Sequence, residues 1–312
     1  APAPRPLLGR LPAGGRLLVS AGGSAWVVAP DGAKRRLGSY TGASWSPRGL
    51  FVVAWQGGEL TALEPDGDVR WSLRGADAVT SARWAPADGY RIAYVAGSAL
   101  RIVNGDGTGD RRFAETRSAA IPAWRPGAGH VLAYADARGG VTVADVDTGR
   151  LLWVSHPLPG VHGLAWSPDA TGLIVLTARG AVLLNGAGKR SATLPLPPGT
   201  RASSAAWTPG AEVVLVLRDA AADRSELALL TPASGRRREL LTAPGRLGPT
   251  TWSPDGHVLL VPWPDADQWL FFAPERRRRL VEAVEDVAAQ FAPGRTSTRF
   301  PSSVEWAPAT GP

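Results

Sequence analysis

The pentapeptide Trp252-Ser253-Pro254-Asp255-Gly256 displays the unit from which this chain is built, because its first and third residues recur along the sequence. Tryptophan followed after one residue by proline occurs seven times, at Trp45, Trp84, Trp124, Trp166, Trp207, Trp252 and Trp306. Subtracting each position from the next gives spacings of 39, 40, 42, 41, 45 and 54 residues. This regular recurrence predicts an array of similar structural units.

Each unit contains four short segments with the composition of β-strands. After the proline comes a tight-turn sequence, as at residues 254–256, and then an apolar run, as at residues 258–261. Such runs, short, rich in β-branched residues and bounded by glycine, predict strands that are buried on both faces. A third strand, a second glycine turn and a more polar strand such as residues 69–73 complete the unit.

A four-stranded sheet cannot bury both of its faces alone. Stacking such sheets radially covers both faces of each, which is the β-propeller solution. We place each repeated tryptophan at the start of the innermost strand, where its ring fills the wedge between neighbouring sheets. For all seven rings we favour core packing over a direct role in binding.

The two ends of the chain complete the count of sheets. The unit of Trp306 has only one strand, and the N-terminal region supplies three, at residues 17–20, 26–29 and 36–40, without a Trp-x-Pro sequence. Their pairing leaves no free sheet edge. The sequence therefore predicts an all-β, seven-bladed propeller of four-stranded antiparallel blades over residues 15–312. The N-terminal strands pair with the C-terminal strand, and residues 1–14 form a Pro-rich lead-in or tether.

The longest interval, between Trp252 and Trp306, predicts an insertion. Leu280, Val284, Val287 and Phe291 are spaced i, i+4, i+7 and i+11, which predicts a short helix over about 282–292 after an outer strand near residues 278–281. This helix and the run of arginines at 276–279 either dock an anionic partner or form a cover over apolar surface with a solvated turn. We favour the second interpretation.

Composition excludes several classes of chemistry. The chain has no cysteine, so it has no disulfide, thiolate nucleophile or cysteine-based metal site. No apolar run of about 18 residues is present, so no segment predicts a membrane span. The net charge of +7 could attract nucleic acid, anionic lipid or wall polymers. Arginine-rich codon usage of a GC-rich genome also explains it, and we favour that explanation.

The repeat resembles that of TolB-type, WD-repeat-like propellers over about residues 15–312, on the sequences at 45–49, 166–169 and 252–256. The Gly-His and Trp-Asp pairs of true WD repeats are absent, so the TolB-like branch is the closer match. This resemblance implies a fold and not an activity. Residues 263–271 and 304–306 are also similar to uncharacterised actinobacterial envelope proteins, which implies an extracytoplasmic propeller with a membrane anchor outside this chain.

Motifs for catalysis are missing. There is no Gly-x-Ser-x-Gly elbow of an α/β-hydrolase and no phosphate-binding loop of an NTPase. Of the four histidines, His156 and His162 flank the loop at 157–160 and could meet as two ligands of a metal, if another blade supplied a third. We favour the interpretation that both are polar loop residues. We therefore assign no catalytic residue, no metal site and no cofactor.

Strand direction predicts where a partner would bind. In an antiparallel blade, connections between the second and third strands share one face of the disc with connections between blades; we call this the loop face. Arginine and tryptophan are frequent at binding hot spots. Trp263 and Trp269 bracket a polar loop, and their rings either join the binding surface or tuck back against the blade. The candidate binding residues are Trp55, Arg138, His156, His162, Arg179, Arg218, Arg224, Trp263 and Trp269.

These features favour a non-enzymatic, monomeric scaffold whose loop face binds a protein or peptide partner in the bacterial envelope. One alternative is a hydrolase or lyase with its site in the central channel. A second is an electrostatic binder of anionic polymer, whose affinity would fall steeply with salt. No specific nucleic-acid motif is present.

Overall fold

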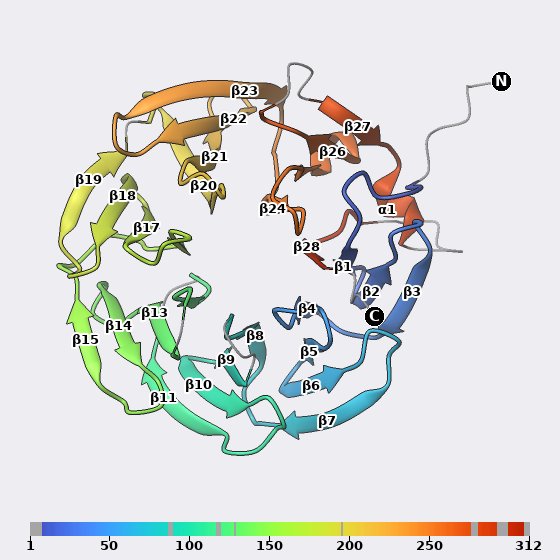
Figure 1. Ribbon diagram of the computed structural model, residues 1–312, viewed down its shortest axis with the longest axis vertical. Helices are drawn as coiled ribbons and strands as arrows, with labels where there is room; N and C mark the ends of the chain where they lie inside the picture. The colour runs from blue at the N-terminus through green and yellow to red at the C-terminus, as the bar shows by residue number, and fades with distance from the viewer. Residues whose placement is uncertain are drawn as a thin grey trace.

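The structure, a computed structural model, describes residues 8–86, 90–116, 120–127, 129–194, 196–275, 280–291 and 299–308. Within them, seven four-stranded antiparallel sheets are arranged radially around a central axis (Figure 1). The prediction of an all-β, seven-bladed propeller is confirmed. No helix of the described part is long and apolar enough to cross a lipid bilayer.

We number the blades in chain order and give their strands from the axis outward. Blade 1 contains β4 (Gly42–Trp45), β5 (Val52–Gln56), β6 (Glu59–Leu63) and β7 (Val69–Arg74). Blade 2 contains β8 (Val79–Trp84), β9 (Arg91–Ala96), β10 (Ala99–Asn104) and β11 (Arg111–Glu115). Blade 3 contains β12 (Ala123–Trp124), β13 (Val131–Ala135), β14 (Val141–Asp145) and β15 (Leu151–Val154). Blade 4 contains β16 (Gly163–Trp166), β17 (Gly172–Thr177), β18 (Gly180–Asn185) and β19 (Arg190–Leu194).

The remaining blades follow the same plan. Blade 5 contains β20 (Thr200–Trp207), β21 (Val213–Asp219), β22 (Arg224–Thr231) and β23 (Arg236–Pro244). Blade 6 contains β24 (Thr251–Trp252), β25 (Leu259–Trp263), β26 (Gln268–Phe272) and β27 (Leu280–Val284). Blade 7 contains β28 (Ser303–Ala307), β1 (Arg16–Ala21), β2 (Ser24–Val28) and β3 (Lys34–Gly38).

Blade 7 closes the ring, because its innermost strand comes from the C-terminal end of the chain and the other three come from the N-terminal end. β28 pairs antiparallel with β1, with Leu17 opposite Trp306 and Val19 opposite Val304. The Trp306 indole Nε1 donates to the Gly14 carbonyl at 2.8 Å. The predicted pairing of the two ends is confirmed (Figure 1).

The repeated tryptophans lie at the end of the innermost strands and not at their start, as the sequence analysis had placed them. Trp45 is the last residue of β4, and Trp84 is the last residue of β8. The reason is the proline two residues later, which has no N–H to donate to a ladder and begins the turn to the second strand. The strand therefore precedes the tryptophan.

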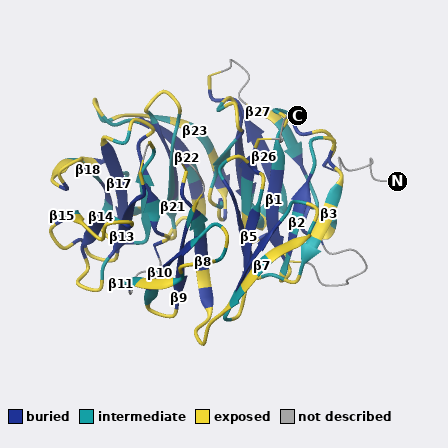
Figure 2. Cartoon of the chain, turned by 60° about the horizontal axis from the view of Figure 1, so that its bottom comes forward, coloured by how far each residue is buried: buried dark blue, intermediate teal, exposed yellow. Residues whose placement is uncertain are grey.

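Buried apolar side chains of the described residues form seven clusters, one in each wedge between neighbouring blades. Each cluster contains one repeated tryptophan or has one packed against it. Trp45, for example, lies with Leu18 and Val27 of blade 7, so the ring faces the preceding blade. Figure 2 shows the buried inner strands and the exposed connections and outer strands.

Three of these tryptophans also tie neighbouring blades through a hydrogen bond. The indole Nε1 of Trp124 donates to the carbonyl of Arg83 at 2.9 Å. Trp166 donates to Ala123 at 3.1 Å, and Trp207 donates to Ala165 at 2.9 Å. In each case the acceptor directly precedes the tryptophan of the preceding blade, and we call this contact the interblade indole bond. Among the described residues, the Nε1 atoms of Trp45, Trp84 and Trp252 are buried without a partner.

The insertion before the last strand is less helical than predicted. β27 continues to Val284, and the helix α1 contains only Val287–Gln290. Leu280 and Val284 both pair with β26, where a register shift interrupts the ladder. An i, i+4 spacing of apolar residues is therefore part of a bulged strand here. The arginine run at 276–279 lies outside the described residues.

The helix joins the N-terminal segment to the propeller. The Leu8 N–H donates to Gln290 Oε1 at 3.1 Å, and Leu8 and Leu11 are buried in the wedge between blades 6 and 7. Phe291, which follows α1, packs against the rings of Trp26 and Trp269. From Leu8 onward, the stretch predicted as a lead-in thus packs on the blades.

Candidate binding surface on the loop face

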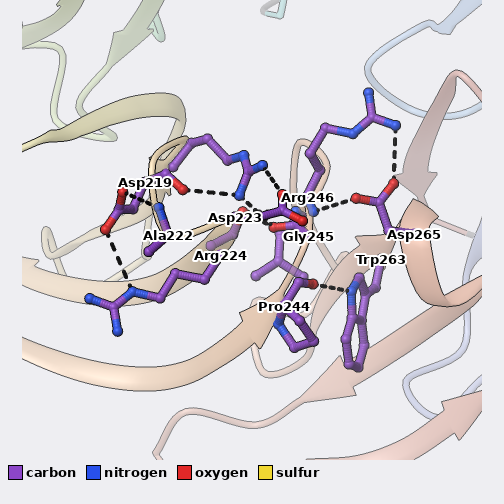
Figure 3. A network of polar contacts seen from close by, with 12 residues as sticks. Asp219, Ala222, Asp223, Arg224, Pro244, Gly245, Arg246, Trp263 and Asp265 are labelled. Carbon is purple, nitrogen blue, oxygen red and sulfur yellow. Dashed lines mark hydrogen bonds and ion pairs between the residues drawn. The ribbon is translucent and has the colours of Figure 1, made fainter.

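Three of the predicted binding residues belong to a network of polar contacts where blades 5 and 6 adjoin, and Figure 3 labels two of them, Arg224 and Trp263. Arg218 lies near the end of β21, Arg224 begins β22, and Trp263 ends β25. Antiparallel strand order brings these ends to the loop face together. The network also contains Asp223 and Asp265, which the sequence analysis did not single out.

Arg218 is held by its neighbours. Its Nη1 donates to the carbonyls of Gly245 at 3.1 Å and Asp219 at 3.2 Å, and its Nη2 pairs with the Asp223 carboxylate. Arg224 is less constrained, since its Nε lies 3.6 Å from Asp219 and its side chain is 60% exposed. Arg218 therefore braces the connection between β21 and β22, whereas Arg224 remains reachable from solvent.

Trp263 is half-buried and fixed at its polar edge. Its Nε1 donates to the Pro244 carbonyl at 2.9 Å, and its ring packs against the cluster between blades 5 and 6. The 3₁₀ helix η1 (Pro264–Ala266) follows and presents Asp265, which accepts bonds from the Arg246 N–H at 2.8 Å and its guanidinium at 3.0 Å. These bonds hold the pKa of Asp265 below its ordinary value. Where blades 5 and 6 adjoin, the arginines are therefore paired with carboxylates, Arg218 with Asp223 and Arg246 with Asp265.

Two predicted surface tryptophans belong to the core, so their assignment to the binding surface was wrong. Trp55 is buried between blades 1 and 2, and a Cβ on Gly42 would lie only 2.2 Å from its ring. Trp269 is fully buried, with its ring centroid 5.5 Å from that of Phe291. Both lie in strands covered on both faces, where a large ring enters the core whichever way it points.

The two histidines of the connection between blades 3 and 4 differ in environment. His156 is exposed. His162 is half-buried, with Nδ1 3.1 Å from the Gly160 carbonyl and Nε2 2.9 Å from the Ala202 carbonyl of blade 5. Both ring nitrogens of His162 thus face backbone oxygens. Throughout the described residues, no three of the His, Asp and Glu side chains form a group that could hold a metal.

Arg138 and Arg179 occupy equivalent connections of blades 3 and 4, between the second and third strands. Both side chains are exposed. The Arg138 backbone N–H donates to Asp136 Oδ1 at 2.8 Å, which fixes the turn. In the part of the chain that the structure describes, neither guanidinium forms an ion pair. The loop face therefore carries two exposed guanidinium groups without an ion pair over blades 3 and 4, although the Asp136 carboxylate lies in the same turn as Arg138.

A charged pair on the inner strands was also missed. Glu305 of β28 accepts the Trp45 N–H of β4 at 2.9 Å and pairs with Arg83 of β8 at 3.0 Å, so it links blades 7, 1 and 2. Aligning the repeats on their tryptophans would have revealed it. The residues before the seven tryptophans are Ser44, Arg83, Ala123, Ala165, Ala206, Thr251 and Glu305.

Comparison with known proteins supports the fold. No protein-family model and no curated protein matches the sequence. Among solved structures, the β-propeller domain of Cps50 (Swd1) from Myceliophteria thermophila is similar, with a TM-score of 0.57 and 14% identity. The match covers 83% of this chain and 96% of that chain. At this identity the likeness shows a WD-repeat-like propeller fold alone.

Proposed function

We propose that this protein is a non-enzymatic binding scaffold whose loop face, over blades 3 to 5, holds an acidic segment of a protein or peptide partner. The observation that carries the proposal is the pair of exposed guanidinium groups, Arg138 and Arg179, which have no carboxylate partner among the described residues. The exposed His156 lies on the same face, as does Arg224, whose side chain is 60% exposed and lies 3.6 Å from Asp219.

Arginine on a rigid turn suits this role. A guanidinium binds a carboxylate through two parallel hydrogen bonds, which gives direction as well as attraction. Because the turns are fixed by the strands and by bonds such as Arg138 N–H to Asp136, little loop ordering is needed when a partner binds. The compensated border of blades 5 and 6 would lie beside this contact and contribute the half-buried edge of Trp263.

The assignment of this propeller to the TolB-like branch and to the cell envelope is also a proposal. The Trp-Ser-Pro-Asp-Gly repeat supports the TolB-like branch, and the similarity of residues 263–271 and 304–306 to envelope proteins supports an extracytoplasmic protein. We propose in addition that it is a monomer. Proteins of the cell envelope are therefore the partners to search first.

The test compares two double variants in a crosslinking capture from a bacterial envelope fraction. Arg138→Ala with Arg179→Ala removes the two exposed guanidinium groups from the loop face. With about 1 kcal/mol for each contact, we expect the yield of the captured partner to fall by roughly tenfold or more. The matched control is Arg150→Ala with Lys189→Ala, which removes the same charge from blades 3 and 4 on the opposite face.

The control should retain the partner. Equal capture by the wild type and both double variants would reject the loop face as the binding surface. Equal losses in both double variants, together with wild-type capture that falls steeply as salt is raised, would instead favour the electrostatic binding of anionic polymer.

A further inference from the structure

A concave site opens on the face opposite the loop face. This face carries the turns between the first and second strands and between the third and fourth strands, and we call it the turn face. The pocket there has a volume of about 640 Å³ and lies between blades 1 and 2. Ligand pockets commonly measure about 300–1,000 Å³. The cavity is thus large enough for one bulky side chain and the backbone that carries it.

Aromatic rings form the floor of this pocket. Phe51 of blade 1 stacks on Trp84 of blade 2, with ring centroids 6.4 Å apart and an interplanar angle of 23°. Trp71 of β7 is fixed by a bond from its Nε1 to the Gly105 carbonyl at 2.8 Å. At the rim, Leu50 and Tyr90 are each 46% exposed. The core between these blades therefore remains open toward solvent at the turn face.

Blade 1 differs from the other blades at the residue that creates this floor. In blades 1 to 6, the residue after the repeated tryptophan donates its N–H to a carbonyl across the turn, which defines equivalent positions. In blade 1 the acceptor is Phe51; in blades 2 to 6 the acceptors are Arg91, Val131, Gly172, Glu212 and Val258. Trp84 lacks the interblade indole bond and stacks on Phe51. An aromatic residue at this turn position is thus a feature of this one junction among the six.

Charge at the rim is asymmetric. Arg48 is exposed, and in the described ranges it has no ion pair. Arg70 contacts Glu64 at 3.2 Å, with the two side chains 57% and 36% exposed, so the pair is solvated and weak. On the side of blade 2, Asp106 accepts a bond from the Tyr90 hydroxyl at 3.3 Å and bonds from Thr108. A carboxylate entering the pocket would be attracted to the side of blade 1.

We propose that this pocket binds an extended peptide segment that inserts one large apolar or aromatic side chain between Leu50 and Tyr90 and places a carboxylate beside Arg48. The rings of Phe51, Trp71 and Trp84 would cover the inserted side chain, and the guanidinium would fix its direction. Because this site and the loop face lie on opposite faces, one molecule can hold two partners. The proposal does not depend on the loop face.

The test uses a fluorescein-labelled, end-capped hexapeptide, Gly-Glu-Phe-Glu-Ser-Gly, and measures its affinity by fluorescence anisotropy. Two matched peptides replace Phe by Ala or both Glu by Lys. We expect saturable binding of the parent peptide, with affinity about tenfold weaker for the Ala peptide and about fivefold weaker for the Lys peptide. A parent peptide that does not saturate, or three peptides of equal affinity, would overturn the proposal.

Protein variants locate the binding. Leu50→Glu should weaken the parent peptide at least tenfold, because it places a like charge at the rim. Leu280→Glu, at a leucine of blade 6 that is 43% exposed, should leave the affinity unchanged. Arg48→Glu should reverse the preference between the Glu and Lys peptides, which misfolding could not produce. The loop-face double variant should bind the parent peptide normally, and equal affinity for Leu50→Glu and wild type would place the peptide elsewhere.

Discussion

At the scale of single residues, each repeated tryptophan fills a wedge, but only some also hold the neighbouring blade by a hydrogen bond. Trp166 buries its ring and donates to the Ala123 carbonyl, whereas Trp84 buries its ring and donates to no described acceptor. The comparison separates two contributions that a tryptophan normally makes together, apolar burial and satisfaction of a buried polar group.

Replacing these two rings by phenylalanine tests that separation. Trp166→Phe loses ring volume and leaves the Ala123 carbonyl without its donor, whereas Trp84→Phe loses ring volume alone. We expect Trp166→Phe to lower the free energy of unfolding by about 1 kcal/mol more than Trp84→Phe, as measured by urea denaturation. Equal losses would show that the interblade indole bond adds no stability.

A carboxylate between blades 2 and 3 gives a dependence on pH. Asp147 lies 2.8 Å from Arg91 and 2.5 Å from the His130 ring. Partial burial raises the pKa of Asp147, but the hydrogen bonds from His130 and Arg91 outweigh it and hold the pKa below its ordinary value. A lowered carboxyl pKa stabilises the fold above the unfolded value of about 3.9, and this stabilisation is lost as pH falls through the folded pKa.

We therefore expect Asp147→Asn to lower the free energy of unfolding by about 1 kcal/mol or less near pH 6, because solvent screens the pair of Asp147 and Arg91. We also expect the free energy of unfolding of the variant to fall less steeply than that of the wild type as the pH is lowered. The measurement is the free energy of unfolding from pH 6 to pH 2. Asp66→Asn, which removes a turn carboxylate without an ion pair among the described residues, is the control for the loss of one carboxylate. Parallel curves for wild type and Asp147→Asn would contradict this account.

At the scale of strands and turns, the sequence predicted an element well where a single physical requirement determines its residues. Proline and glycine marked the turns, and the short apolar runs marked the second and third strands, because those strands are buried on both faces. The helix was overestimated because β27 and α1 share one apolar pattern, and only pairing with β26 distinguishes them. The predicted position of the tryptophan at the start of the strand was wrong, because the proline two residues later begins a turn and the strand therefore precedes the tryptophan.

The segment that enters β1 offers a sharp test of ring closure. Gly15 has φ +73°, and a Cβ there would lie 2.6 Å from the Ala307 carbonyl oxygen and 2.8 Å from Trp306 Nε1. Gly14 has φ +65° but open space around its Cβ position. Gly15→Ala should therefore lower the melting temperature by several degrees more than Gly14→Ala, which adds backbone strain alone. Equal melting temperatures would show that β28 does not pack closely there.

At the scale of the whole molecule, strand order alone predicted which loops share the loop face. Whether each side chain there is exposed, paired or buried could be seen only in the structure. Arg138, Arg179 and His156 are exposed, as a binding role requires. Arg218 is engaged by Asp223 and Gly245, and Trp55 and Trp269 are in the core. Ion pairs between blades and the direction of a ring in a doubly covered strand depend on contacts between repeats, which spacing along one chain does not encode.

Both proposed binding sites rely on a rigid disc, since closure fixes the relative positions of turns from all seven blades. The loop face offers exposed arginine to a carboxylate-rich segment, and the turn face offers an aromatic floor with a basic rim. An open ring would separate β28 from β1 within blade 7 and would expose the edges of both strands to pairing with other chains.

Closure is tested most directly by a disulfide between the two ends of the chain. Ser20 and Ser303 face each other across β1 and β28, and the protein has no cysteine of its own. Facing residues of antiparallel strands have Cα atoms about 4.5–5.5 Å apart, within the range of a disulfide. Ser20→Cys with Ser303→Cys should crosslink within one molecule under native oxidation and raise the unfolding midpoint, whereas crosslinking only after denaturation would contradict the closed ring.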